Sequence, residues 1–134
     1  MTSKIPTIES VMTPLVYAVG IDEAVEVAED LMIEDGIRHL AVTDGGSLVG
    51  IVSDRDIAVT PNAAELAIRS KIAVREICSL DVYSAEVEEE LDGILITMSE
   101  RHLGATLVTR NGEIAGIFTT TDACRCFAES LRAS

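Results

Sequence analysis

Aromatic and basic residues are scarce in this chain of 134 residues. Tryptophan is absent and aromatic residues make up 3% of the sequence, although 48% of it is hydrophobic. The core must therefore be built from small aliphatic side chains, as in tightly packed layers of strands and helices. Lysine and arginine number 10 against 23 aspartates and glutamates, which gives a net charge of −13. Binding to nucleic acid or to an anionic membrane needs a basic face, so this balance argues against both.

The chain also lacks a long apolar run. No stretch reaches the length of a membrane span, and Met1-Thr2-Ser3-Lys4 does not begin a signal peptide, so we expect no membrane insertion and a cytoplasmic location. Three cysteines without framework spacing fit a reducing compartment. Cys124 and Cys126 stand two apart in an expected helix and do not share a face, which disfavours a metal site. The sequence holds no Walker loop and no dinucleotide fingerprint.

The most informative feature is an internal repeat. Sliding the sequence against itself gives one dominant offset of 66 residues, without a gap, which places Asp56 on Asp122. Two units of this length rarely fold alone, so we expect each to complete the core of the other. The same offset superposes Val16-Tyr17 on Val82-Tyr83, Met32 on Met98, Glu34 on Glu100, Val42-Thr43 on Val108-Thr109, Gly46 on Gly112 and Gly50-Ile51 on Gly116-Ile117.

Each repeat predicts the same order of elements: strand, helix, strand, strand, helix. Asp22 is expected to cap the first long helix, and Gly36 and His102 are expected to end the two matching helices in a left-handed conformation. Turn residues over 44–47 and 110–113 predict two hairpins. The first repeat is expected to hold a short turn or helix over Thr7–Met12, strands over Leu15–Val19, Ile37–Thr43 and Leu48–Val52, and a helix over Asp54–Thr60. The second is expected to hold strands over Val82–Ala85, Leu107–Thr109 and Ile114–Phe118, and a helix over Asp122–Leu131.

The functional signal is a stretch that occurs twice, at 50–56 and 116–122. In each copy a buried strand runs into a helix, with a hydroxyl at the junction (Ser53, Thr119) and an aspartate three residues later (Asp56, Asp122). A helix start offers unpaired N–H groups that suit a phosphate, and the aspartate could accept two bonds from the vicinal hydroxyls of a ribose. The same residues also form an ordinary helix cap, and the residues alone leave both interpretations open.

Further motifs give the chain a family resemblance. Val11-Met12-Thr13-Pro14 precedes the first strand, and Ile37-Arg38-His39-Leu40-Ala41-Val42 precedes the first hairpin. With the doubling, these motifs resemble a tandem pair of CBS domains (cystathionine-β-synthase domains), often called a Bateman module, from about Ile5 to about Phe127. The resemblance implies an α+β (or α/β) fold of two β-α-β-β-α repeats related by pseudo-two-fold symmetry. We expect residues 5–60 to form the first repeat, 61–71 a helical connector and 72–128 the second repeat.

The resemblance also implies a ligand. Pairs of this family commonly bind an adenosine-containing molecule, such as AMP, ADP, ATP or S-adenosylmethionine, with Mg²⁺ as an optional companion and no required cofactor. The hydroxyl of the repeated motif meets phosphate and the aspartate meets ribose, and each site takes residues from the opposite repeat. One expected site combines Ile37, Arg38 and His39 with Thr119 and Asp122, and the other combines Leu103, Gly104 and Ala105 with Ser53 and Asp56.

The two expected sites differ in charge. Arg38 and His39 bring basic groups to the site of Asp122, whereas Gly104 and Ala105 bring none to the site of Asp56. We therefore expect the site of Asp122 to bind a nucleotide more tightly. The expected function is non-enzymatic: a regulatory module that senses adenine nucleotides and acts through a conformational change on a homodimer or an unidentified protein partner. The alternative is a scaffold for dimerisation without a ligand, and a small enzyme is a third class that finds no nucleophile or metal set in the sequence.

Overall fold

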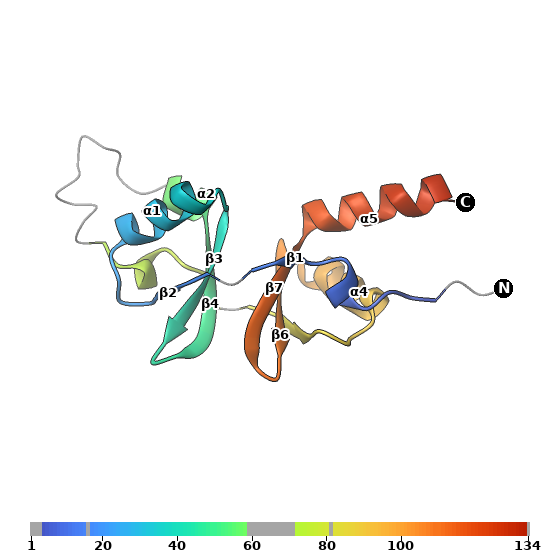
Figure 1. Ribbon diagram of the computed structural model, residues 1–134, viewed down its shortest axis with the longest axis horizontal. Helices are drawn as coiled ribbons and strands as arrows, with labels where there is room; N and C mark the ends of the chain where they lie inside the picture. Colours follow the sequence, from blue (N-terminus) through green and yellow to red (C-terminus); the bar gives the residue numbers. More distant parts are fainter. Residues whose placement is uncertain (1–3, 16, 59–71, 81, 134) are drawn as a thin grey trace. The chain divides into compact units, whose positions relative to one another are not determined.

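The computed structural model describes residues 4–15, 17–58, 72–80 and 82–133, which form two sheets with their helices (Figure 1). The strands are β1 (Thr13–Pro14), β2 (Ala18–Gly20), β3 (His39–Asp44), β4 (Ser47–Ser53), β5 (Ser84–Glu86), β6 (Ala105–Arg110) and β7 (Glu113–Thr119). The helices are α1 (Val25–Asp35), α2 (Asp54–Ala58), α4 (Leu91–Arg101) and α5 (Thr120–Ala133), with the short 3-10 helices η1 (Ile8–Ser10) and η3 (Val74–Glu76).

Both sheets follow the same plan. In the sheet β2-β3-β4, the parallel strands β2 and β3 are joined through α1, and β3 returns as the antiparallel strand β4. The second sheet repeats this with β5, α4, β6 and β7, and β1 adds an antiparallel edge on β7. Both hairpins even shift their register at the matching place, between Val42 and Thr43 and between Val108 and Thr109. The predicted α+β class and the two β-α-β-β-α units are confirmed.

Helix ends and hairpin turns follow the prediction from turn chemistry. Gly36 and His102 end α1 and α4 with φ angles of 63° and 55°, in the left-handed region. Gly45 and Gly46 join β3 to β4 with φ angles of 59° and 87°, and the turn between β6 and β7 has the same two-residue geometry. Two positive φ angles in succession are the requirement of the two-residue hairpin that matches strand twist.

The first strand of each unit begins later than the sequence suggests. The strand predicted over Leu15–Val19 is observed at Ala18–Gly20, and the one over Val82–Ala85 at Ser84–Glu86. The prediction that Asp22 caps α1 is wrong, because Ala24 occupies that position and the N–H group of Val25 donates to the carbonyl of Ile72. Asp22 instead pairs with Arg75. The predicted helix over 54–60 is described only as far as Ala58, and the predicted connector lies outside the described residues.

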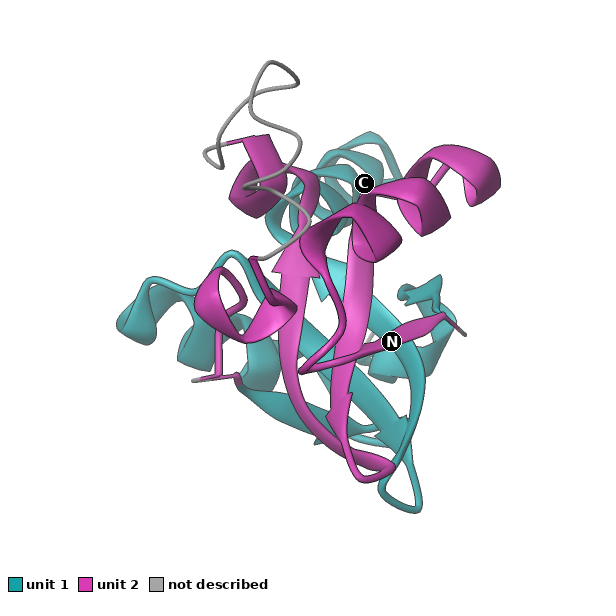
Figure 2. Cartoon of the chain, turned by 90° about the vertical axis from the view of Figure 1, so that its left-hand side faces the viewer, with its two compact units in different colours: residues 1–16, 83–134 teal, residues 17–82 magenta. Residues whose placement is uncertain are grey.

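Contacts group the chain into two compact units that are not the two halves of the sequence. Unit 1 holds the described parts of residues 1–16 and 83–134, and unit 2 those of 17–82 (Figure 2). Each unit thus combines a sheet with a short leading segment that precedes the other repeat in the sequence. In unit 1, Thr13 pairs with Ile117 in β7, and in unit 2 Ser79 exchanges two backbone hydrogen bonds with Ile51 in β4, of 2.9 and 3.0 Å.

A glycine in each sheet makes room for that leading segment. A Cβ atom at Gly50 would stand 2.4 Å from the carbonyl oxygen of Ser79. At Gly116, it would stand 2.4 Å from the sulfur of Met12 and 2.8 Å from the carbonyl oxygen of Thr13. All three distances are shorter than van der Waals contact, so only glycine allows the leading segment to pack so close.

Each unit has its own aliphatic core. The core of unit 2 gathers α1, β3 and β4, and Val74 of the leading segment is fully buried in it. The core of unit 1 gathers α4, β6 and β7 around Phe118, and Ile8 is fully buried there in the same manner. Among the described residues, no helix is both long and apolar enough to cross a membrane.

The two units differ beside their hairpins. In unit 1 the carboxylate of Glu86 accepts bonds from the Thr109 hydroxyl and from the backbone N–H of Asn111. These bonds lower the pKa of the Glu86 carboxyl, and the bond from the Thr109 hydroxyl has the largest influence. Gly20 takes the matching position in unit 2 and brings no side chain, and a shallow hollow of about 330 Å³ lies there, lined by residues of 20–23 and 43–45.

Candidate functional site

The repeated motif of unit 1 lies where β7 runs into α5. One oxygen of the Asp122 carboxylate, Oδ2, accepts bonds from the backbone N–H of Thr119 at 2.9 Å and from its hydroxyl at 3.1 Å. The N–H of Asp122 donates back to the Thr119 hydroxyl oxygen at 3.3 Å. This reciprocal cap ends the strand and starts the helix. Asp122 is therefore held rigidly, with 7% of its side chain exposed.

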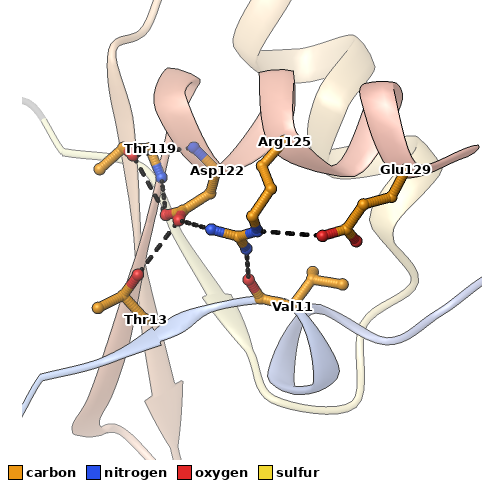
Figure 3. A network of polar contacts seen from close by, with 6 residues as sticks. All are labelled: Val11, Thr13, Thr119, Asp122, Arg125 and Glu129. Carbon is orange, nitrogen blue, oxygen red and sulfur yellow. Dashed lines mark hydrogen bonds and ion pairs between the residues drawn. The ribbon is translucent and has the colours of Figure 1, made fainter.

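The second oxygen of Asp122 meets two further donors (Figure 3). Oδ1 accepts the hydroxyl of Thr13 at 3.2 Å and Nη1 of Arg125 at 2.9 Å. Arg125 also donates from Nη2 to the carbonyl oxygen of Val11 at 3.0 Å, and its Nε lies 3.9 Å from Oε1 of Glu129. The network thus joins the cap of α5 to the leading segment of unit 1.

Asp122 stays ionised in spite of its burial. Desolvation is the largest single influence and by itself would raise the pKa of the carboxyl. The N–H of Thr119, the Arg125 guanidinium and the hydroxyls of Thr119 and Thr13 together outweigh it, so the pKa of Asp122 is lowered. The site therefore presents a fixed negative charge at neutral pH.

The repeated motif of unit 2 has the same cap and fewer partners. Oδ2 of Asp56 accepts the backbone N–H of Ser53 at 2.8 Å and its hydroxyl at 3.0 Å, and the N–H of Asp56 donates back at 3.2 Å. Asp56 is only partly buried. Within the described part of the chain, its other oxygen, Oδ1, has no hydrogen-bond or ion-pair partner. With respect to the described residues, unit 2 therefore keeps an open carboxylate oxygen, whereas both oxygens of Asp122 in unit 1 are engaged.

The strand that precedes each hairpin starts beside the motif of its own unit. His39 is the register partner of Ser53, and the N–H of Asp54 donates to the carbonyl of Arg38 at 2.9 Å. In unit 1, Ala105 is the partner of Thr119, and the N–H of Thr120 donates to the carbonyl of Gly104 at 3.1 Å. The side chains of Ile37 and Leu103 pack against the cores of their units, whereas Arg38 is exposed.

The predicted site residues are thus divided between the units. Thr119, Asp122 and Leu103 belong to unit 1, and Ile37, Arg38, His39, Ser53 and Asp56 belong to unit 2. The predicted combination of Arg38 and His39 with Thr119 and Asp122 joins residues of different units and stays a prediction. Sequence reasoning missed Thr13 and Arg125 as partners of Asp122. The position of Arg125 three residues after Asp122, on one helix face, is the signal that could have found it.

The sequence matches the CBS domain family over residues 8–60 and again over residues 74–129. The chain belongs to the CBS domain family. It is a tandem CBS pair, and the two family matches correspond to its two repeats.

The relatives of this CBS pair include parts of enzymes and a pair solved with ligands. The chain is 31% identical over 102 residues to L-aspartate semialdehyde sulfurtransferase of Methanocaldococcus jannaschii, covering 75% of this chain and 19% of the relative. It is 28% identical over 123 residues to inosine-5′-monophosphate dehydrogenase of Thermoplasma acidophilum, covering 91% and 24%. The chain therefore spans about a fifth to a quarter of the length of these curated relatives.

One similar solved structure holds adenosyl compounds. It is the CBS domain pair of protein MJ0100 in complex with 5′-methylthioadenosine and S-adenosyl-L-methionine. That pair is 25% identical to this chain, with a TM-score of 0.72, and the alignment covers 95% of this chain and 99% of the other.

Metal-ligating clusters and reactive thiols are two other kinds of site that the described residues of a CBS pair could hold. The described residues contain no cluster of three or more His, Cys, Asp or Glu side chains that could hold a metal ion. Desolvation by burial raises the pKa of the Cys78 and Cys126 thiols, so both are poor thiolate nucleophiles at neutral pH. The candidate site is therefore best described as two carboxylates on rigid caps, one in each unit.

Proposed function

We propose that this CBS pair is a regulatory module that binds an adenosine-containing ligand at the capped aspartates. The observation that carries the proposal is the pair of reciprocal caps, Thr119 with Asp122 and Ser53 with Asp56, in a chain similar to a CBS pair solved with 5′-methylthioadenosine and S-adenosyl-L-methionine. A carboxylate fixed in this way can accept charge-assisted bonds from both hydroxyls of a ribose.

The charge of the chain favours a particular class of adenosine compound. With a net charge of −13, the protein repels polyanions unless a local basic group offsets the field. 5′-Methylthioadenosine is neutral and S-adenosylmethionine carries a positive sulfonium, so neither needs such an offset. AMP, ADP or ATP needs one, and Arg38 with His39 is the group that the sequence predicts for it beside Thr119 and Asp122.

These considerations predict a ranking of the two sites that depends on the ligand. Arg38 favours Asp122 as the tighter site for AMP, as expected from the sequence. For 5′-methylthioadenosine we propose the reverse ranking, because one oxygen of Asp56 has no partner among the described residues, whereas both oxygens of Asp122 are engaged. Calorimetry of AMP and 5′-methylthioadenosine on Asp56→Asn and Asp122→Asn separates the two contributions. An AMP affinity that Arg38→Ala and Asp122→Ala both leave unchanged would contradict the role of Arg38.

The decisive first experiment is mass spectrometry of small molecules released from the freshly purified chain, followed by thermal shift with AMP, ADP, ATP, S-adenosylmethionine and 5′-methylthioadenosine. A ligand that binds only the folded state must raise the melting temperature by mass action. At a ligand concentration a hundredfold above Kd, the free energy of unfolding rises by about 2.7 kcal/mol. The shift should shrink in Asp56→Asn or Asp122→Asn. No shift with any of the five compounds would overturn the proposal.

Regulation would follow from a difference in affinity between two conformations of the module. A ligand that prefers one arrangement shifts the population towards it, and a second copy of the chain or another protein reads the result. The module is proposed to carry no activity of its own, and the reactions named for its longer relatives are not assigned to it.

A ligand-free scaffold is the second candidate function, because one observation favours it. Asp122 is fully engaged by side chains and one backbone N–H of its own unit, as expected of a site that is filled internally. Large apolar side chains also stand exposed on helices, including Ile33 at 73% and Phe127 at 66%. Sedimentation of the chain with no ligand, together with the thermal-shift panel above, separates the two functions.

A further inference from the structure

The carboxylate of Asp122 has no acceptor position left for a ligand. Oδ2 takes the N–H and the hydroxyl of Thr119 at 2.9 and 3.1 Å, and Oδ1 takes Thr13 at 3.2 Å and Arg125 at 2.9 Å. A carboxylate offers about four such positions. A ribose hydroxyl that donates to Asp122 must therefore displace one of the present donors.

Arg125 is the donor that can leave. Thr119 is fixed by its backbone in the cap, and Thr13 is held by the pairing of β1 with β7. Arg125 lies on the surface of α5 with 48% of its side chain exposed, and Figure 3 shows its guanidinium between Asp122 and Glu129. Glu129, one helical turn further on and 70% exposed, already lies 3.9 Å away and can take the guanidinium.

We propose that Arg125 sets the affinity of unit 1 for ligands with a vicinal diol. It competes with the diol for Oδ1 of Asp122, and it turns to Glu129 when the diol binds. This inference rests on the proposed function and adds to it a specificity-determining residue outside the repeated motif.

The competition is confined to one of the two repeats. By the repeat offset, Val59 takes the position of Arg125 in the first repeat, and a valine side chain donates no hydrogen bond. Oδ1 of Asp56 has no partner among the residues that the structure describes. A ligand therefore meets an open carboxylate oxygen in unit 2 and a protected one in unit 1.

Arg125→Met tests the competition in an Asp56→Asn background, which restricts binding to unit 1. Calorimetry should find adenosine bound about tenfold more tightly than by the Asp56→Asn parent, since a hydrogen bond to a charged group no longer has to be broken. 3′-Deoxyadenosine, which lacks the diol, should gain much less. Arg132→Met is the matched control, because it removes the same charge about 10 Å further along the same helix and should leave both affinities unchanged.

Glu129→Gln provides a second variant that leaves the contacts of Arg125 with Asp122 and Val11 in place. It removes the alternative partner of the guanidinium, so it should weaken adenosine binding about two- to threefold, as expected of an exposed ion pair. Circular dichroism establishes that each variant is folded.

Two outcomes would overturn the inference, and they differ in whether they also contradict the proposed function. If adenosine binds the Asp56→Asn parent and Arg125→Met leaves its affinity unchanged or lowers it, the inference is wrong and the proposed function stands. If folded Arg125→Met in the wild-type background binds neither adenosine nor S-adenosylmethionine, both are wrong, because the opened site should then bind most readily.

Discussion

The two units share a fold and differ at their candidate sites, the capped aspartates. Each has a glycine that admits a leading segment, a matching hairpin and a capped aspartate. They differ in how far the aspartate is engaged. Asp122 is buried and paired with Arg125, whereas Asp56 is only partly buried and one of its oxygens has no partner among the described residues. The backbone fold and the chemistry of the site thus vary separately between the two repeats. The contacts of the aspartate in one repeat do not predict those of the aspartate in the other.

The largest expected effect comes from variants that disrupt the packing of a leading segment against its sheet, which occurs in both units. Gly50→Ala should destabilise the protein by about 3 kcal/mol, because its Cβ would collide with a backbone oxygen that cannot turn away. Gly116→Ala should cost about 2 kcal/mol, since the flexible side chain of Met12 can move aside and the backbone oxygen of Thr13 would stand at 2.8 Å rather than 2.4 Å. Urea denaturation measures both.

Gly93→Ala is the control for these two variants. Gly93 lies in α4 with nothing within 4 Å of an added Cβ, so alanine should stabilise the protein by about 0.5–1 kcal/mol. Equal stability of Gly50→Ala and wild type would show that the leading segment of unit 2 does not pack against β4 in solution.

The next largest effect concerns the charge of Asp122. Asp122→Asn should lower stability by about 2 kcal/mol at neutral pH, because it breaks a buried charged network, and Asp56→Asn should lower it less. The pKa of Asp122 is lower in the folded than in the unfolded protein, so its contribution is complete above about pH 4. It is lost as the pH falls through the folded pKa.

Thermal melting as a function of pH tests this sign. The difference in stability between wild type and Asp122→Asn should be constant from pH 7 down to about pH 5 and should shrink below about pH 4. A difference that grows on acidification would contradict the network as described.

A smaller effect distinguishes the two sheets at their cores. The hydroxyl of Thr106 in β6 is fully buried and has no hydrogen-bond partner among the described residues, whereas Leu40 takes the matching place in β3. Thr106→Val should therefore stabilise the protein by about 1 kcal/mol. Thr109→Val is the contrasting variant, since its hydroxyl donates to Glu86 and its loss should destabilise. A destabilised Thr106→Val would mean that this hydroxyl is satisfied in solution.

The smallest effect lies at the ends of the two matching helices. His102 holds a left-handed conformation that Gly36 adopts without a Cβ penalty. His102→Gly should stabilise the protein by about 0.5 kcal/mol, and Gly36→His should destabilise it by at least as much. Differential scanning calorimetry of both variants checks the pair, and changes of the same sign in both would contradict the comparison.

Local rules predicted much of this fold from the sequence. The sequence predicted the offset of the repeat, the turn over 44–47 and the helix ends at Gly36 and His102. Turns and helix ends could be predicted because their chemistry depends on neighbouring residues. The helix start was misplaced at Asp22 because a distant residue decides it: the carbonyl of Ile72 receives the first N–H of α1. A capping preference cannot anticipate a partner from another segment.

The candidate site divides in the same way. The spacing predicted a helix cap at Ser53 with Asp56 and at Thr119 with Asp122, and both caps are present. The binding of a ligand by these four residues stays a prediction. The hydrogen bond from Thr13 to Asp122 could not be predicted, because the two residues are 109 positions apart and meet only through the pairing of β1 with β7. Contacts of this kind depend on the completed sheet.

The exchange of leading segments sets an order of assembly during synthesis. Residues 17–82 are contiguous, so every part of unit 2 has been translated before β5 is made. Unit 1 has to wait: Thr13 is translated 109 positions before the aspartate that it will contact. We therefore expect nascent chains to acquire protease resistance first in unit 2, while Ile8, later buried in the same core as Phe118, is still accessible to a chaperone.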